Sequence, residues 1–191
     1  MKPDTPSSRS SAHAPVLDAA AIERALRRIA HEIIERNPDL GSVILAGIPS
    51  RGVEIARRLA EIIESLGHAR IATGAIDVSM HRDDVGTRAE LPRVQVSSLP
   101  LPLENKTVII VDDVFFTGRT ARAAMDAIGS FGRPARIQLA TLIDRGHREL
   151  PIRADYVGKN IPTAPGEQVN LRLHDVDGEP DAVWLIKEEK S

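Results

Sequence analysis

The spacing of apolar residues changes along the chain and predicts an alternation of helices and strands. Apolar residues that recur every three or four positions indicate a helix with one apolar face, and this spacing predicts helices over 18–36, 53–66 and 120–131. Asp18 can cap the first of these helices, and Gly67 stops the second. Short continuous apolar runs have the length of buried strands instead, and they predict strands over 42–48, 70–78, 107–111 and 136–144.

This alternation predicts an α/β fold in which helices cover both faces of a parallel sheet. The pattern is lost from 79 to 106, where charges and prolines predict a long loop or a hairpin with one strand around 94–96. The last third of the chain is irregular, with short strands predicted near 154–158, 169–174 and 182–186. Residues 1–15 are rich in Ser and Pro and predict a disordered tail, which leaves 16–191 as a single domain.

Composition narrows the function classes. The 191 residues carry a formal net charge of −2, which argues against a globally basic nucleic-acid binder but leaves room for a local basic patch. The chain has no cysteine, which excludes disulfides, thiolate zinc sites and a cysteine nucleophile and fits a reducing cytoplasm. No apolar run approaches the length of a membrane span. We therefore expect a cytoplasmic protein with no membrane partner.

Three polar clusters each follow a predicted core strand: "PSRG" at 49–52, "DDVFFTGRT" at 112–120 and "DRGHRE" at 144–149. In parallel α/β sheets, ligands bind beyond the carboxyl ends of the strands. The shared position of the three clusters predicts a ligand site at that edge, and this coincidence carries more weight than any single motif.

The cluster at 112–120 combines two opposite preferences. Just before a predicted helix, "TGRT" (117–120) offers backbone N–H groups, hydroxyls and a helix N-terminus, which suit a phosphate, and Gly118 allows close approach. Asp112 and Asp113 would repel a phosphate unless they face hydroxyl groups or a cation such as Mg²⁺. Phosphoribosyl diphosphate (PRPP) satisfies both preferences, because it has a phosphate at one end and a diol with a diphosphate at the other.

Other interpretations of this cluster remain. Paired aspartates at a strand end also occur in the acidic pocket of phospho-receiver domains, for which Asp144 could supply a further carboxylate, but no lysine is suitably placed. "TGRT" alone could simply begin a helix. The cluster is not a P-loop, because the GxxxxGK[ST] spacing is absent. The sequence "VIIVDD" directly before "TGRT" favours the PRPP interpretation.

The stretch "VIIVDDVFFTGRT" (108–120) resembles the PRPP-binding signature of type I phosphoribosyltransferases. Four further segments, 28–37, 47–52, 81–84 and 144–163, resemble the bacterial pyrimidine operon attenuators that also have uracil phosphoribosyltransferase activity. The resemblance covers nearly the whole chain after the tail. It implies the type I phosphoribosyltransferase fold, a mostly parallel sheet flanked by helices, with a small hood and a flexible active-site loop at 79–106.

The resemblance also implies a reaction, in which uracil and PRPP give UMP and diphosphate without a covalent nucleophile. Catalysis would rest on positioning and charge stabilisation. Asp112 and Asp113 would hold the ribose hydroxyls, directly or through the cofactor Mg²⁺. The implied PRPP and UMP contacts of the following loop are Val114, Phe115, Phe116, Thr117, Gly118, Arg119 and Thr120.

The diphosphate is expected to bind at the "PSRG" turn, through Ser50, Arg51 and Gly52, and the resemblance implies a non-proline cis peptide bond there. Within the flexible loop, Arg82 is expected to reach the diphosphate, with Arg88 or Arg93 as helpers. Together with Arg51 and the two aspartates, Arg82 completes the set of expected catalytic residues.

Base recognition is implied for three residues, Arg145, Val157 and Lys159. Purine-using relatives carry an acid at the position of Phe116, so its absence argues against a purine substrate. Departures from the family pattern are His81, where tyrosine is expected, and Phe115-Phe116, where leucine-tyrosine is more usual.

The resemblance finally implies that a homodimer or homotetramer binds the leader mRNA of pyrimidine genes when UMP or UTP is bound, and so causes transcription attenuation. The expected RNA contacts are Arg24, Arg27, Arg28, His31, Arg148 and Arg153. One departure bears on this surface: the turn "APGEQ" at 164–168 brings Glu167 and no basic residue. Two alternatives stay open, a nucleotide-sensing RNA regulator with weak or vestigial transferase activity and a phosphoribosyltransferase for another base.

Overall fold

The computed structural model describes residues 14–79 and 97–187, which form a five-stranded sheet, a separate two-stranded sheet and the helices around them. The helices are α1 (Ala19–Arg36), α2 (Arg51–Ser65), α3 (Arg119–Gly129), α4 (His174–Asp177) and the 3₁₀ turn η1 (Leu40–Ser42). The strands are β1 (Val43–Gly47), β2 (Ala72–Ala75), β3 (Thr107–Phe115), β4 (Arg136–Asp144), β5 (Tyr156–Asn160), β6 (Glu167–Arg172) and β7 (Ala182–Lys187).

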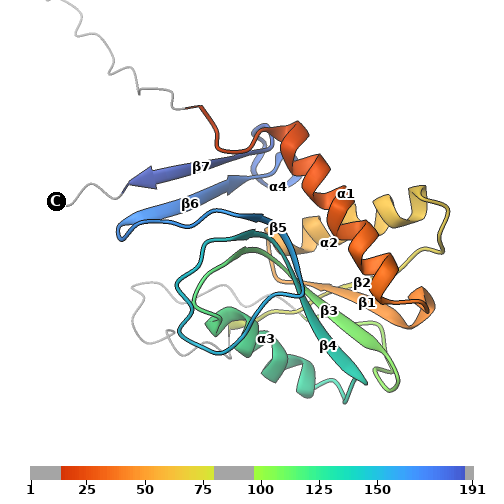
Figure 1. Cartoon of the computed structure of the whole chain (residues 1–191). Helices are drawn as coiled ribbons and strands as arrows, with labels where there is room; N and C mark the ends of the chain where they lie inside the picture. The colour runs from red at the N-terminus through yellow and green to blue at the C-terminus, as the bar shows by residue number, and fades with distance from the viewer. Residues whose placement is uncertain (1–13, 80–96, 188–191) are drawn as a thin grey trace, which may run out of the picture.

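The main sheet has the strand order β2-β1-β3-β4-β5, and all its neighbouring strands are parallel. Helices α1 and α2 cover one face of this sheet and α3 covers the other (Figure 1). Strands β6 and β7 pair antiparallel and form a small separate layer, with α4 between them in sequence; we call β6, α4 and β7 the hood. The predicted α/β fold, a mostly parallel sheet flanked by helices with a small hood, is confirmed. No helix in the described ranges is both long enough and apolar enough to span a membrane.

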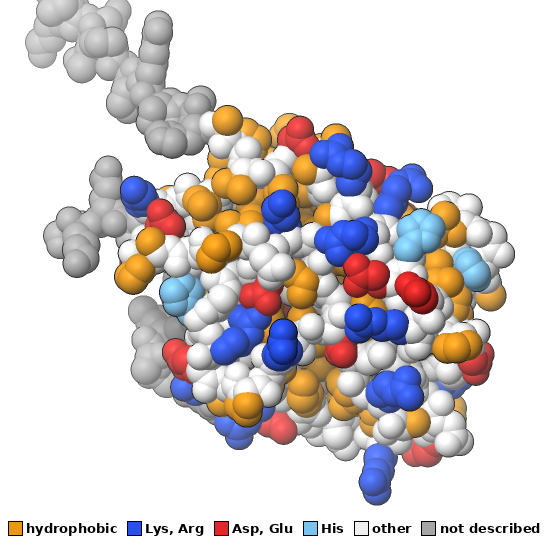
Figure 2. All heavy atoms as spheres, viewed as in Figure 1, with side chains coloured by type: hydrophobic (Ala, Val, Ile, Leu, Met, Phe, Trp, Pro, Cys, Tyr) orange, Lys and Arg blue, Asp and Glu red, His pale blue; other side chains and the backbone are white. Residues whose placement is uncertain are grey.

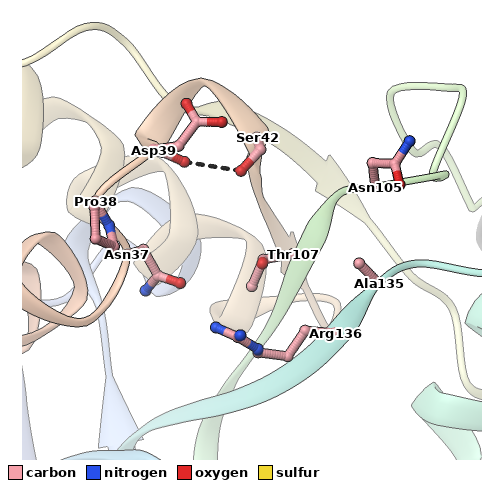
Figure 3. A pocket seen from close by; sticks show the side chains of 8 residues that line it. All are labelled: Asn37, Pro38, Asp39, Ser42, Asn105, Thr107, Ala135 and Arg136. Carbon is pink, nitrogen blue, oxygen red and sulfur yellow. Dashed lines mark hydrogen bonds between the residues drawn. The ribbon is translucent and has the colours of Figure 1, made fainter.

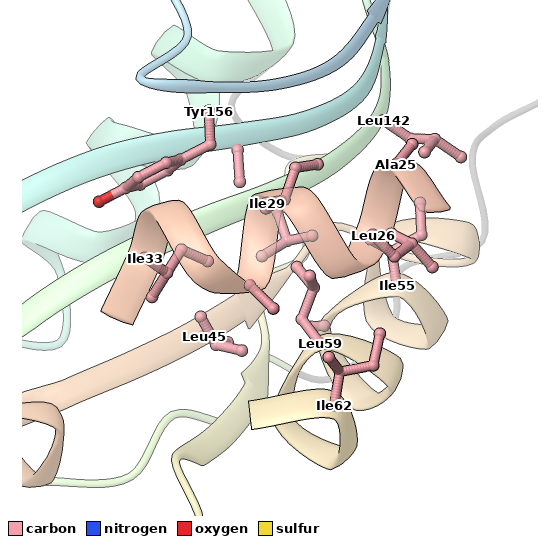
Figure 4. Packing of buried hydrophobic residues seen from close by; sticks show 14 of the residues in the cluster. Ala25, Leu26, Ile29, Ile33, Leu45, Ile55, Leu59, Ile62, Leu142 and Tyr156 are labelled. Carbon is pink, nitrogen blue, oxygen red and sulfur yellow. The ribbon is translucent and has the colours of Figure 1, made fainter. Parts of the chain in front are cut away.

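Two apolar clusters hold the layers together, one on each face of the sheet. On the α1 and α2 face, Ile29 and Ile33 of α1 pack with Leu59 of α2 and with Leu142 and Tyr156 of the sheet (Figure 4). All five side chains are fully buried. Because burying one large apolar side chain contributes about 1.5–3 kcal/mol, this cluster is a principal source of stability. On the other face, α3 contributes small residues such as Ala124, which lets the helix lie close to the strands.

The boundaries of several elements differ from those predicted. The sequence predicts that β3 ends at Val111, but β3 continues through both aspartates to Phe115, because Asp112 and Val114 stay in register with Thr141 and Ile143 of β4. Backbone pairing therefore extends beyond the apolar run. Helices α2 and α3 each begin one or two residues earlier than predicted, at Arg51 and Arg119. The strand predicted around 94–96 lies outside the described residues.

The described part of the patternless stretch packs against the sheet. Leu99 and Leu103 are buried in the α3-side cluster. Ser98 forms an antiparallel bridge with Ala75, whose strand β2 is the edge of the sheet. Residues 97–106 thus anchor the end of this stretch beside the carboxyl end of β2.

Candidate active site

The three predicted polar clusters meet at one edge of the sheet. Strands β1, β3 and β4 are adjacent and parallel, so the segments that follow them emerge side by side. Backbone hydrogen bonds join these segments: Ile48 N donates to Val111 O at 2.9 Å, Arg145 N donates to Phe115 O at 3.0 Å, and Glu149 N donates to Thr117 O at 3.0 Å. We call this region, residues 48–52, 112–120 and 144–149, the carboxyl edge.

The turn from β1 into α2 is compact because two glycines allow its backbone to approach its neighbours. A Cβ on Gly52 would lie under 3.0 Å from Val111 O, and one on Gly47 under 3.0 Å from Val53 Cα. The Pro49–Ser50 peptide bond is cis, as the resemblance implies. Ser50 occupies the N-cap position of α2 but its side chain makes no capping hydrogen bond. The positive end of α2 therefore abuts β3 at the level of the aspartates.

The loop from β3 into α3 has the local geometry of an anion site. Gly118 is the N-cap of α3 with φ of +95°, a left-handed conformation that favours glycine, and it supplies no side-chain cap. The N–H groups of the first helical turn have no acceptor within the helix, and they carry the positive end of the helix dipole. Arg119 Nε bonds Glu149 Oε2 at 2.8 Å, which ties this turn to the segment after β4. Such a turn suits a phosphate.

The two aspartates differ in exposure. The residue Asp112 is 6% exposed, whereas Asp113 is half-buried. Asp113 Oδ1 accepts a hydrogen bond from Val114 N at 2.8 Å, and its Oδ2 lies 3.7 Å from Arg51 Nη1. Among the described residues no group of three or more His, Cys, Asp or Glu could hold a metal ion alone. Mg²⁺ commonly binds through one or two carboxylates plus substrate phosphates, so this pair fits a metal that arrives with a phosphorylated ligand.

Arg51 makes a bidentate ion pair at the carboxyl edge, and its partner was not predicted. Its Nε donates to Asp177 Oδ2 at 3.0 Å and its Nη2 donates to Asp177 Oδ1 at 2.7 Å. This bidentate contact with Arg51 lowers the pKa of the Asp177 carboxyl to about 2. The same contact raises the pKa of the Arg51 guanidinium, which therefore stays charged. The hood, through α4, thus reaches the turn predicted to bind diphosphate.

The predicted base-recognition residue Arg145 also lies at this edge and links it to the hood. Its guanidinium carbon is 4.1 Å from the centre of the Phe116 ring. Its Nε donates to Thr163 Oγ1 at 3.1 Å and its Nη2 donates to Glu167 O at 2.6 Å. Lys159 is exposed on β5, where its register partner is Ile143 near the end of β4, and Val157 is half-buried on the same strand.

Arg148 and Phe115 have structural surroundings that the sequence patterns do not indicate. The Phe115 ring is 1% exposed in the α3-side cluster, so only its backbone could face a ligand. The Arg148 guanidinium carbon lies 3.6 Å from the centre of that ring, and Arg148 also bonds Asp144 and the carbonyl of Phe116. Its Nε is buried without a hydrogen-bond partner. Arg148, predicted to contact RNA, therefore packs within the carboxyl edge.

The other predicted RNA contacts lie on exposed surface. Arg24, Arg27, Arg28 and His31 all project from α1, and Arg153 precedes β5. Arg27 pairs with Glu23 at 3.0 Å and Arg28 pairs with Glu32 at 2.8 Å. Arg28 Nη2 also donates to Val157 O at 3.0 Å, so it holds α1 against β5. Figure 2 shows Lys and Arg side chains spread over this side of the molecule with Asp and Glu between them, rather than a continuous basic patch.

A hollow of about 270 Å³ opens at the opposite end of the strands from the carboxyl edge. Thr107 and Arg136, the first residues of β3 and β4, lie in its wall (Figure 3). No residue predicted to bind a ligand lines it. We call it the amino-end hollow, and its lining residues are Asn37, Pro38, Asp39, Ser42, Asn105, Thr107, Ala135 and Arg136.

Arg82, Arg88 and Arg93, which are expected to reach the diphosphate, lie outside the described residues, as does His81, so the roles predicted for the three arginines stay predictions.

Comparison with known proteins agrees with this geometry. A family model described as "Phosphoribosyl transferase domain" matches residues 14–174. A protein named "Bifunctional protein PyrR" from Chloroflexus aurantiacus is 56% identical over 170 residues, which cover 89% of this chain and 93% of that one. A protein of the same name from Roseiflexus sp. strain RS-1 is 52% identical over 172 residues, covering 90% and 94%.

Solved structures show the same fold at much lower identity. The hypoxanthine phosphoribosyltransferase from Trypanosoma cruzi in complex with IMP has a TM-score of 0.71, with 19% identity, 95% of this chain covered and 94% of that one. This likeness bears on the fold alone, whereas the sequence identities define the relationship more closely. The chain belongs to the phosphoribosyltransferase domain family and, within it, to the group of bifunctional PyrR proteins.

Proposed function

We propose that this protein transfers the phosphoribosyl group of PRPP to uracil, which yields UMP and diphosphate. One observation carries the proposal: the N-terminus of α3, whose N-cap Gly118 supplies no side chain, the carboxylates of Asp112 and Asp113, and the guanidinium of Arg51 all lie at the carboxyl edge. PRPP presents a phosphate, a ribose diol and a diphosphate, and each of these groups suits one of the three features.

The proposed roles follow from charge and hydrogen-bonding capacity. The backbone N–H groups of Thr117 to Thr120 bind the 5′-phosphate, and Asp112 and Asp113 hold the ribose hydroxyls. Negative charge grows on the diphosphate as it leaves, and Arg51 and the N-terminus of α2 stabilise it. Removing one such donor typically costs a factor of about 10² to 10³ in rate. Asp112 and Asp113 would also hold Mg²⁺, which would neutralise further charge on the diphosphate.

Uracil is the proposed base. The named PyrR relatives support a pyrimidine substrate, and Phe116 provides no carboxylate to recognise a purine. Arg145 can donate to a uracil carbonyl, and its contacts with Phe116 and Thr163 fix its position. Val157 and Lys159 of β5 complete the proposed base site.

A product assay tests the transferase. The purified protein is incubated with PRPP, Mg²⁺ and either uracil or hypoxanthine, and nucleotides are separated by chromatography. We expect UMP from uracil, no IMP from hypoxanthine, and loss of UMP when the metal is chelated. IMP formation would show a transferase for another base. Absence of UMP from a protein that still binds UMP would show a nucleotide sensor without transferase activity.

A second function is proposed on the exposed basic side chains of α1. We propose that a homodimer or homotetramer in the cytoplasm binds pyrimidine-operon leader mRNA when UMP or UTP occupies the carboxyl edge, and so attenuates transcription. Arg24, Arg27, Arg28 and His31 share one helix surface, and Arg153 adds a cation. Only 3% of the residues are aromatic, so recognition depends on arginine and hydrogen bonds more than on stacking.

A gel-shift measurement tests this second function. We expect UMP to increase the affinity for leader RNA, and Arg24→Ala to weaken binding and reduce its salt dependence. Arg122→Ala is the matched control, because Arg122 is exposed on α3, which covers the other face of the sheet. Absence of a UMP-dependent shift at low salt would contradict RNA regulation without touching the transferase. Light scattering of the same samples measures the oligomeric state.

A further inference from the structure

We propose that Asp177 of the hood is a positioning residue for the transferase: it holds Arg51 in the orientation that binds diphosphate. The inference deepens the proposed function and rests on it. The two residues are 126 positions apart in sequence, and their bidentate contact joins the N-terminus of α2 to α4.

Asp177 is itself held in place. Its side chain is only 9% exposed. Leu173 N donates to its Oδ2 at 2.8 Å, and Arg172 Nη1 donates to its Oδ1 at 3.3 Å. Together with the two bonds from Arg51, these donors fix both carboxylate oxygens. A buried carboxylate with this many partners is a rigid anchor, whereas a surface ion pair would leave the arginine mobile.

The contact also determines which edge of the guanidinium is presented to a ligand. The Asp177 carboxylate binds the Nε and Nη2 donors of the Arg51 guanidinium. Nη1 faces the other way, toward Asp113 at 3.7 Å. An arginine has five N–H donors in a fixed fork, so the Nη1 side remains directed at the aspartate predicted to hold the ribose and metal. A diphosphate attached to that ribose would meet a guanidinium already oriented toward it.

Preorganisation is the expected benefit. A long arginine side chain that is free in the unbound protein loses rotamer freedom when a ligand immobilises it, and this loss weakens binding. Asp177 removes that loss, because the side chain is ordered before the ligand arrives. Competition between Asp177 and diphosphate for Arg51 would have the opposite sign, and binding measurements on Asp177 variants separate the two effects.

Asp181 provides a matched control. It lies four residues after Asp177, and its carboxylate binds Arg58, which is also on α2; the Nη2–Oδ1 distance is 3.3 Å. It also accepts a hydrogen bond from His174 N at 2.8 Å. Loss of this carboxylate weakens the contact between the hood segment and α2 but leaves Arg51 with Asp177. A purely structural role for Asp177 would therefore be reproduced by Asp181→Asn.

The test is calorimetric binding of Mg²⁺–diphosphate and, separately, of UMP, to the full-length protein and to Asp177→Asn, Asp177→Glu and Asp181→Asn. We expect Asp177→Asn to weaken diphosphate binding about 10-fold. The neutral amide of Asn cannot accept both hydrogen bonds from the guanidinium as the carboxylate does, so Arg51 loses its fixed orientation. UMP has no diphosphate, so its affinity should stay within about twofold. Asp181→Asn should leave both affinities unchanged, and Asp177→Glu should restore part of the diphosphate affinity because it keeps the charge.

The outcomes distinguish this inference from the proposed function. Equal diphosphate affinity in wild type and Asp177→Asn, an equal loss in Asp181→Asn, or tighter binding in Asp177→Asn would overturn the positioning role while leaving the transferase intact. Diphosphate binding that depends on Asp177 in a protein that forms no UMP would contradict the proposed transfer but support the positioning role. A wild-type protein that binds no diphosphate would overturn both.

Discussion

The two ends of the central strands differ in what surrounds them. At the amino end, the hollow is lined by groups that serve the fold: Asp39 caps its own 3₁₀ turn through Gly41 N, and Asn37 bonds Ile33 O and the Tyr156 hydroxyl. At the carboxyl edge, Ser50 and Gly118 occupy the N-cap positions of α2 and α3 without a side-chain cap. By contrast, Asp18 caps α1, which begins beside β7, where Leu17 pairs with Val183.

The difference shows that the amino-end hollow is not the better candidate for function. The amino-end hollow of about 270 Å³ has two charged lining residues, Asp39, whose carboxylate caps its own 3₁₀ turn, and Arg136 at the start of β4, so it offers space but few groups arranged for a ligand. The carboxyl edge combines two helix N-termini, two carboxylates and an oriented arginine. The parallel α/β fold places the helix N-termini there, but it requires neither the carboxylates nor the arginine at that position. Together these groups offer an anion-binding backbone, carboxylates and a cation at one place, so their concentration indicates a site for a phosphorylated ligand.

The largest expected effect comes from neutralising a carboxylate at the carboxyl edge, and the same change at the amino-end hollow serves as its comparison. Asp113→Asn should reduce kcat/KM for UMP formation by about 10² to 10³, because it removes a charge that holds the ribose or the metal. Asp39→Asn, at the amino-end hollow, should leave kcat/KM within about twofold, since surface changes away from a site have small effects. Steady-state rates of both variants check the comparison, and a large loss in Asp39→Asn would reverse it.

A backbone contact gives the next effect. Gly52→Ala places a Cβ under 3.0 Å from Val111 O, where neither backbone can easily move. The free energy of unfolding should fall by about 1–3 kcal/mol, which lowers Tm by several degrees. Gly129→Ala is the control, because nothing lies within 4 Å of its added Cβ and α3 contains it. Urea unfolding measures both; equal stability of the two variants would be inconsistent with a tight turn from β1 into α2.

The amino end should affect stability but not catalysis. Tyr156→Phe removes a buried hydroxyl that accepts from Asn37 Nδ2 at 2.9 Å and donates to Gln138 Oε1 at 3.1 Å. The free energy of unfolding should fall by about 1–2 kcal/mol, because the partners lose hydrogen bonds inside the protein. The KM for PRPP should not change. A change in KM at constant stability would connect the amino end to the site.

The smallest expected effect is a dependence of the free energy of unfolding on pH in the acidic range. The pKa of the Asp177 carboxyl is lowered from 3.8 to about 2 by Arg51. A carboxyl whose pKa is lower in the folded state stabilises it fully above pH 3.8, and this stabilisation is lost as the pH falls through about 2. Urea unfolding between about pH 5 and about pH 2 should therefore show a shallower decline for Asp177→Asn than for wild type. Parallel curves would exclude the linkage.

Much of the fold could be predicted because local patterns determine it. The helical spacing from Ile22 to Ile33 and the apolar run before Asp112 specify which faces are buried, and the alternation of elements specifies a parallel sheet. The convergence of the polar clusters followed from the same logic. The end of β3 was predicted wrongly, because the register with β4, rather than hydropathy, extends that strand through Asp113.

The missed features depend on contacts between distant segments. Asp177 lies in an irregular region, and no spacing rule connects it with Arg51. A sequence pattern also cannot distinguish an arginine on open surface from Arg148, whose guanidinium covers the buried Phe115 ring. For the contact between Asp177 and Arg51, the only sequence signal was the group of acidic residues close to the hood strands.

A crystal structure with bound UMP tests most directly whether the carboxyl edge is the ligand site. We predict the 5′-phosphate within hydrogen-bonding distance of backbone N–H groups of Thr117 to Thr120, and the ribose hydroxyls facing Asp112 and Asp113. UMP in the amino-end hollow, or a phosphate away from the N-terminus of α3, would contradict the proposed site and the functions assigned to it.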